Sequence, residues 1–334
     1  MANTNHPQYN IYKIHFKIDI EKSVQNHDKD ANTYLKNAEQ CMLSLFDLKT
    51  IKGLYQYHEK KDNVIYPNDV MCPIRWDVIW WRVNNVQKKK YVKHLGEDSS
   101  GRGKYEDDEI NSYPYTNVIV DLRKDYCQLA IQKTSAWPNT DNLKDIIQES
   151  FHRLLSDKYG LDIEIEPKME PTKFWSFVNR QIYDYGDYIR KVTFSLKNPK
   201  RVKGINKSEI KSARLKSMAR VAEISDAIKS FFTLEFDCNS DKKKFSERNR
   251  DVAEMVNLCS SNGFDLTVHF KNFKLYRIDE RVKACYLLPD DYLMSFSHNS
   301  VNTNNTLDLI DWLDDVHNKT QNSDASQTPT KRNT

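Results

Sequence analysis

Residues 11–20 read IYKIHFKIDI, and from Tyr12 onward they alternate between apolar and polar side chains. The apolar positions Tyr12, Ile14, Phe16, Ile18 and Ile20 share one parity. Successive side chains of a β-strand point to opposite faces of the sheet, so this period of two predicts a strand. We expect it to be half buried, with Lys13 and His15 on its polar face.

Outward from this strand, one local pattern occurs twice. An amphipathic helical stretch, a glycine and an alternating strand follow one another at 142–166 and again at 246–270, with Gly160 and Gly263 as the expected helix ends. Further strands are predicted by apolar or alternating runs at 76–83, 117–122, 126–132, 188–196, 231–237 and 281–288. Additional helices are expected at 29–46, 171–186 and 208–229.

Helices and strands therefore alternate, but a short turn at Arg123-Lys124-Asp125 indicates a hairpin. This mixture favours an α+β (mixed α/β) fold, in which antiparallel-containing sheets pack with amphipathic helices, over a doubly wound parallel sheet. A polar, basic stretch at 198–207 predicts a domain boundary. We expect an N-terminal α+β domain over 1–198, a C-terminal α/β domain over 199–296 that begins with this basic linker and a helix, and a polar, largely disordered tail over 297–334 with a short helix at 307–316.

Composition excludes several classes of protein. The 334 residues include 51 Lys and Arg against 47 Asp and Glu, a net charge of +4, so the chain as a whole is not a polycation. It has only 8 glycines, and glycine-rich nucleotide loops need that residue for close approach of the backbone to phosphate. Residues 96–104 resemble a P-loop, but Arg102 and Gly103 replace its Lys and Ser/Thr, which favours a surface loop.

The spacing of the cysteines and histidines indicates the cellular compartment and whether a metal is bound. The 6 cysteines include no CxxC pair and the 9 histidines no HxxxH pair, so we expect free thiols in a reducing cytoplasm and no metal site. Residues 1–10 lack the apolar core of a signal peptide, and no run approaches the roughly 18 apolar residues of a membrane span. Abundant Lys, Asn, Ile and Tyr are typical of AT-rich coding in bacteria and mobile elements.

A run of acidic residues at 162–168, DIEIEPK, offers a candidate catalytic site. Strand periodicity places Asp162, Glu164, Glu166 and Lys168 on one face. Glu166-Pro167-Lys168 resembles the E-x-K half of the PD-(D/E)xK nuclease pattern, and that resemblance implies Mg²⁺-dependent cleavage with Asp121 as a partner acid. Pro167 is unusual inside a strand, and solvated strand faces often carry such residues.

Basic residues concentrate in one part of the chain and could follow a phosphate backbone: Lys200, Arg201, Lys203, Lys207, Lys211 and Arg214. A helical wheel of residues 208–229 gives a stripe that we expect to be buried, made of Ile210, Ser217, Val221, Ile224 and Ile228. Basic residues flank this stripe, with Lys207, Lys211 and Arg214 on one side and Lys216 and Arg220 on the other.

A second cluster, Lys88, Lys89, Lys90 and Lys93, precedes His94 and follows the tryptophans Trp76, Trp80 and Trp81. Cations beside aromatic rings are the ingredients of a single-strand platform. The alternative is that the tryptophans are core and the lysines solvate a hairpin.

We therefore expect a cytoplasmic binding protein without a cofactor, more plausibly a DNA- or other nucleic-acid-binding protein than an enzyme, from a bacterial mobile-element or phage-defence (antiviral) setting. One alternative is a nuclease that uses Mg²⁺ and the 162–168 strand. The other is a protein-interaction subunit that docks through the 96–110 loop or the C-terminal segment.

Overall fold

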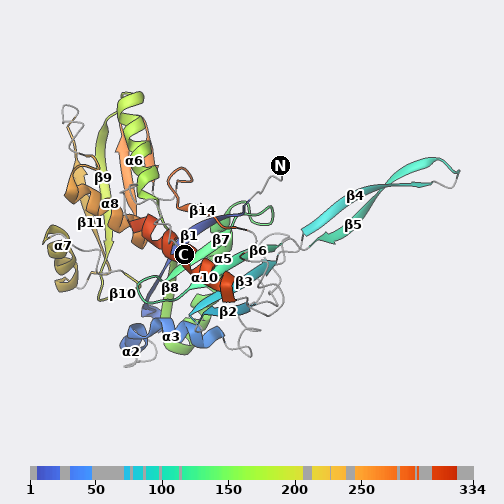
Figure 1. The fold of residues 1–334 in the computed structure, drawn as a ribbon, viewed down its shortest axis with the longest axis horizontal. Coiled ribbons are helices and arrows are strands. Elements are labelled where there is room, and N and C mark those ends of the chain that lie inside the picture. The colour runs from blue at the N-terminus through green and yellow to red at the C-terminus, as the bar shows by residue number, and fades with distance from the viewer. Residues whose placement is uncertain are drawn as a thin grey trace.

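The structure is a computed structural model. It describes residues 6–22, 31–46, 71–75, 78–85, 88–97, 100–112, 115–205, 213–225, 227–237, 245–276, 279–289, 292 and 303–321. Trp76, Lys207 and Lys211 lie outside these ranges. Two sheets and their helices form the body of the molecule, and one long hairpin projects from it (Figure 1).

Strand β1 (Gln8–Ile18) lies at the centre of the larger sheet, as the alternation of residues 11–20 predicts for a strand. The sheet contains eight strands in the described part of the chain, with the order β10-β1-β7-β6-β3-β2, and β8 and β14 also pair with β1. Their bounds are β2 (Met71–Arg75), β3 (Ile79–Asn85), β6 (Tyr115–Asp121), β7 (Gln128–Gln132), β8 (Leu161–Pro167), β10 (Val202–Lys203) and β14 (Cys285–Leu287).

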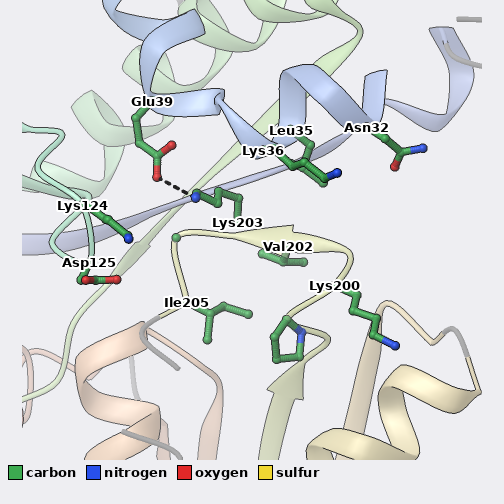
Figure 2. Close-up of a pocket in the computed structure, with 12 residues that line it drawn as sticks. Asn32, Leu35, Lys36, Glu39, Lys124, Asp125, Lys200, Val202, Lys203 and Ile205 are labelled. Atoms are coloured by element: carbon green, nitrogen blue, oxygen red, sulfur yellow. Dashed lines mark ion pairs between the residues drawn. The ribbon is translucent and has the colours of Figure 1, made fainter. Parts of the chain in front are cut away.

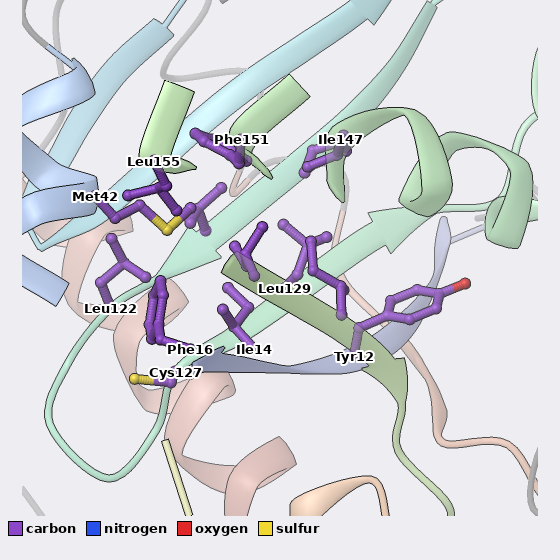
Figure 3. Close-up of a cluster of buried hydrophobic side chains, with 14 of the residues drawn as sticks. Tyr12, Ile14, Phe16, Met42, Leu122, Cys127, Leu129, Ile147, Phe151 and Leu155 are labelled. Atoms are coloured by element: carbon purple, nitrogen blue, oxygen red, sulfur yellow. The ribbon is translucent and has the colours of Figure 1, made fainter. Parts of the chain in front are cut away.

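Both faces of β1 are buried, which corrects the expectation of a half-buried strand. On one face, Tyr12, Ile14 and Phe16 pack under α5 (Thr140–Tyr159) and the short helices α2 (Ala31–Lys36) and α3 (Ala38–Leu43), as Figure 3 shows. On the other face, Lys13 and His15 are each only 1% exposed. The predicted helix at 29–46 is interrupted at Asn37 and ends in the 3-10 turn η1 (Ser44–Phe46).

Both helix–glycine–strand units are confirmed. Helix α5 begins after Asn139, whose side chain accepts a hydrogen bond from the Asp141 backbone, and ends at Gly160 in the left-handed conformation. Strand β8 follows directly. Helix α8 (Arg250–Asn262) ends in the same way at Gly263 and leads to β12 (Leu266–Phe270).

The second sheet has the order β11-β9-β12-β13, formed by β9 (Ile189–Lys197), β11 (Lys229–Glu235), β12 and β13 (Lys274–Tyr276). Helices α6 (Pro171–Asn179) and α8 contribute to its core, and α6 continues into the π-helical turn η2 (Arg180–Asp184). Helix α7 (Ala213–Ile224) precedes β11. Both sheets contain strands from either side of the predicted boundary at 198. Strand β9 precedes the boundary and belongs to the second sheet, whereas β10 and β14 follow it and pair with β1.

All strand pairs in the described ranges are antiparallel, and helices pack on the sheets, so the α+β fold is confirmed. The predicted hairpin at 117–132 is present as β6 and β7. Strands β4 (Lys88–Glu97) and β5 (Gly103–Ser112) pair only with each other and form the projecting hairpin (Figure 1). None of the helices in these ranges is both long and apolar enough to traverse a bilayer.

The last helix, α10 (Thr303–Gln321), is longer than the predicted 307–316 segment and is an integral part of the core. Leu309, Ile310, Leu313 and Val316 are buried against residues of the large sheet that include Tyr9 and Ile11. The regular apolar spacing of these four residues explains the packing. Residues 322–334 of the predicted tail lie outside the described residues.

Candidate nucleic-acid interface

Three segments that are distant in the sequence enclose a cavity of about 570 Å³ beside β1 (Figure 2). They are the α2–α3 region, the turn between β6 and β7, and the stretch that contains β10. We call this cavity the basic groove; its lining residues are Asn32, Leu35, Lys36, Glu39, Lys124, Asp125, Pro199, Lys200, Val202, Lys203, Gly204 and Ile205.

Lysines outnumber acids in the basic groove by four to two. Lys203 Nζ lies 3.5 Å from Glu39 Oε1 within the groove, and Lys200 Nζ lies 3.5 Å from a carboxylate outside it. Lys36 and Lys124 are exposed and form no ion pair with any residue that the structure describes. The lining of the groove therefore carries excess positive charge, and two of its cations pair with no acid in the described ranges.

The turn that carries Lys124 has an unusual backbone. Asp125 and Cys127 have positive φ angles of 72° and 39°, which are uncommon for residues other than glycine. Buried Lys13 holds this turn, because its Nζ donates to the carbonyl oxygens of Asp125 at 3.1 Å and Tyr126 at 2.6 Å. Strained backbone that is held by a buried side chain is a common property of binding sites.

Helix α10 fixes the same turn from its other side. Arg123 donates to Asp121 at 2.8 Å and to Asp314 of α10 at 2.7 Å. The Tyr126 ring lies 4.0 Å from the Arg123 guanidinium and 4.0 Å from the His317 ring, centroid to centroid. Burial, together with the neighbouring cations, lowers the pKa of His317 to about 2, so its ring stays neutral in this stack. These contacts position Lys124 at the edge of the groove.

The β10 side of the groove depends on Asn198 and Gly204. Asn198 donates to the carbonyl oxygens of Ala222 and Ala227 and accepts from the Lys200 backbone at 2.9 Å, which orients the chain at Lys200. Gly204 has a φ of 94°, and a Cβ at this position would lie 2.5 Å from the Ile14 carbonyl oxygen. A glycine therefore allows the Lys203 region to press against β1.

The structure places only part of the predicted basic ridge at this site. Lys200 and Lys203 line the groove and Arg201 is exposed next to them. Arg214 lies in α7, and its side chain is not among those that the structure describes. Sequence reasoning missed Lys36 and Lys124. The sequence places Lys124 in the predicted hairpin turn and Lys36 on the polar side of the predicted 29–46 helix. No local pattern shows that these two lysines lie near Lys200 and Lys203.

The second predicted cluster lies on the projecting hairpin. Lys88, Lys89, Lys90 and Lys93 are residues of β4. The acidic run Glu106–Glu109 of β5 is opposite Tyr91–His94, so Lys93 alone of these four lysines has an acidic residue, Asp107, directly opposite. Trp80 is 8% exposed and belongs to the core, so it cannot serve as a stacking platform. Because the core position of Trp80 removes one of the expected stacking surfaces, β4 is a weaker candidate than the groove.

The acidic strand is divided between two sets of contacts. Glu164 and Glu166 both accept from Lys197 Nζ, at 2.8 and 2.9 Å. Lys168 is buried and donates instead to Gln128 at 3.0 Å, and the amide of Gln128 donates to Asp121 at 3.3 Å. The structure thus links Asp121 to Lys168 through Gln128, whereas the two glutamates share Lys197. No group of three or more His, Cys, Asp or Glu side chains in the described ranges is arranged to hold a metal ion.

Glu164 should make stability depend on pH. Burial raises its pKa, but the ion pair with Lys197 outweighs this and holds the pKa below the usual 4.5. A lowered pKa in the folded state stabilises the protein above pH 4.5, and this contribution disappears as the pH falls through the folded-state value. In urea unfolding at pH 7, 5, 4 and 3, the stability difference between wild type and Glu164→Gln should therefore shrink with decreasing pH. A constant difference would contradict this assignment.

No protein-family model matches the sequence, and no curated protein or solved structure matches it either.

Proposed function

We propose that the protein binds nucleic acid through the basic groove. The observation that carries this proposal is the convergence of four lysines from three distant segments, two of them exposed and without an ion pair in the described part of the chain. Such cations bind phosphates by releasing condensed counterions, and this favours association at low salt.

The composition of the groove supports contact with the sugar-phosphate backbone rather than with bases. Its lining is lysine, two carboxylates, an amide and aliphatic side chains, and no aromatic ring is among the lining residues. Bases are usually read by stacking or by paired hydrogen bonds, whereas phosphate contacts carry no sequence information. We infer that binding tolerates many sequences.

The proposal includes a cytoplasmic location. It is supported by Cys41, Cys127, Cys259 and Cys285, which form no disulfide in the described part of the chain. A bacterial mobile-element or phage-defence setting rests on the AT-rich composition alone.

A Lys36→Glu/Lys124→Glu variant tests the groove. We expect its Kd for a fluorescent 20-nucleotide DNA, in single-stranded and duplex form, to rise about 10- to 100-fold at 100 mM salt. Each phosphate contact contributes about 0.7 (single strand) to 0.9 (duplex) to the slope of log K against log salt. If each lysine neutralises one phosphate, losing two contacts should therefore reduce the magnitude of this slope by about 1.4 to 1.8. Fluorescence anisotropy over a salt series measures both quantities.

The matched control is Lys271→Glu/Lys274→Glu, which makes the same charge change at two exposed lysines outside the groove lining. This variant should bind with a Kd within about threefold of the wild type at the same salt. Equal weakening in the two variants would show that net charge alone governs binding. Failure of the wild type to bind either oligonucleotide at 50 mM salt would refute the function.

A further inference from the structure

Helix α7 exposes the apolar stripe that its sequence predicts to be buried. Val221 is 65% exposed and Ile224 is 74% exposed, and Ile228, just after the helix, is 46% exposed. The helix instead packs through Ala222, which is 2% exposed, and through Met218, which contacts the core of the second sheet. We call Val221, Ile224 and Ile228 the apolar stripe.

An outward apolar stripe requires an explanation, because isolated exposed apolar residues are ordinary but a regular row of them is not. Val221 and Ile224 are one helical turn apart, and Ile228 extends the row in sequence. The side of α7 that faces the core buries little apolar area among the side chains described, since Ala222 is the one buried residue there. Among the side chains described, the large branched residues Val221 and Ile224 of α7 face outward whereas Ala222 faces inward. A helix that has a second neighbour in an assembly shows such an arrangement.

The charges beside the stripe indicate the chemistry of that neighbour. Lys216 and Arg220 are exposed on α7, and neither forms an ion pair within the described ranges. Glu223 is already paired with Lys200. The stripe is consequently bordered by two exposed cations that pair with no acid in the part of the chain that the structure describes, and such a border is complementary to an apolar surface with acidic neighbours.

We propose that the apolar stripe binds an amphipathic helix of a partner protein, whose apolar residues at helical spacing are flanked by Asp or Glu. Apolar contacts with Val221 and Ile224 supply the buried area, and Lys216 and Arg220 select the acidic flanks. A nucleic acid fits this surface less well, since branched aliphatic side chains give bases no ring on which to stack. This proposal rests on observations other than those that carry the basic groove, although the Glu223–Lys200 ion pair connects α7 to the groove.

The test uses the full chain and two synthetic 18-residue helical peptides with the same leucine spacing, one flanked by Glu and one by Lys. We expect the Glu peptide to bind with a micromolar Kd in fluorescence anisotropy and the Lys peptide to bind at least 10-fold more weakly. Val221→Ser/Ile224→Ser and Lys216→Glu/Arg220→Glu should each weaken the Glu peptide at least 10-fold. Because these residues are exposed, both variants should retain the wild-type Tm.

Leu307→Ser is the control, since Leu307 is 62% exposed on α10 and lies outside the stripe. It should leave peptide binding unchanged, and Val221→Ser/Ile224→Ser should leave oligonucleotide binding unchanged. Three results would overturn the proposal: no binding of the Glu peptide, equal binding of both peptides, or loss of binding in the control. If the same variants instead abolish dimers seen in sedimentation, the occupant is a second copy of the chain. If they abolish binding to anionic phospholipid vesicles, the occupant is a lipid surface. Either result would also show that the proposal is wrong.

Discussion

A Glu164→Gln/Glu166→Gln variant is expected to unfold with a free energy about 3–5 kcal/mol lower than that of the wild type. Lys197 carries its charge in a side chain that is only 5% exposed, and it donates to both glutamates. Removing both negative charges leaves a buried ammonium without compensation, and that situation is far more destabilising than the loss of a surface ion pair. Guanidinium unfolding followed by circular dichroism measures the difference.

Two further variants isolate this cause. Adding Lys197→Met to the double variant removes the stranded charge, so most of the lost stability should return. Glu149→Gln breaks an exposed ion pair with Arg153 on α5 and should change the free energy of unfolding by less than about 0.5 kcal/mol. If the double variant were no less stable than Glu149→Gln, Lys197 would not depend on these carboxylates.

The same strand tests the nuclease alternative. Mg²⁺-dependent cleavage of an oligonucleotide by the wild type, abolished in a folded Glu166→Ala protein, would establish it. Because Glu166 supports Lys197, the circular dichroism spectrum of that variant has to match the wild type before a loss of cleavage is assigned to chemistry. Absence of cleavage by the wild type would leave binding as the activity to explain.

A Gly204→Ala variant is expected to lose about 3 kcal/mol of stability and to weaken oligonucleotide binding at least 10-fold. An L-residue at the observed φ of 94° is strained by roughly 1–3 kcal/mol. In addition, its Cβ would meet the Ile14 carbonyl oxygen at 2.5 Å, and this oxygen belongs to the backbone of the central strand. The segment that carries Lys203 would have to move away from β1, which would open the basic groove.

Gly186→Ala is the matched control, since Gly186 also has a positive φ, 64°, but a Cβ there would meet nothing within 4 Å. It should cost about 1–2 kcal/mol through backbone strain alone and leave the affinity for oligonucleotide unchanged. Urea unfolding and anisotropy titrations on the two variants separate the effects. Equal loss of stability in both would show that the close approach to Ile14 has no energetic consequence.

The sequence predicted β1 as a strand but not the burial of its polar face. Alternation shows which residues share a face and carries no information about what covers that face. Lys13 and His15 can be buried because Lys13 Nζ and His15 Nε2 find partners far along the chain, the carbonyl oxygens of Asp125 and Tyr126 for Lys13 and that of Asn262 for His15. Such partners satisfy buried polar groups but leave no local pattern.

The same limit applies to both proposed surfaces. Lys200 and Lys203 were predictable, since they belong to a local run of positive charge. Lys36 and Lys124 join them only because β1 pairs with both β7 and β10, which brings three segments together. On α7, periodicity correctly places Val221 and Ile224 on one side of the helix. It does not show whether that side or the side with Ala222 packs against the core, and in the structure it is Ala222 that is buried.

The contacts of α10 with the Arg123–Cys127 turn have a consequence for the order of events during protein synthesis. Chains fold broadly from the N-terminus as they emerge from the ribosome. Asp314 and His317, which hold Arg123 and Tyr126, are translated almost two hundred residues after the turn, about as late as any described element. A nascent chain can therefore complete its central strands while Lys124 is still without its final support, so the proposed binding of a polyanion should require α10 to have been translated.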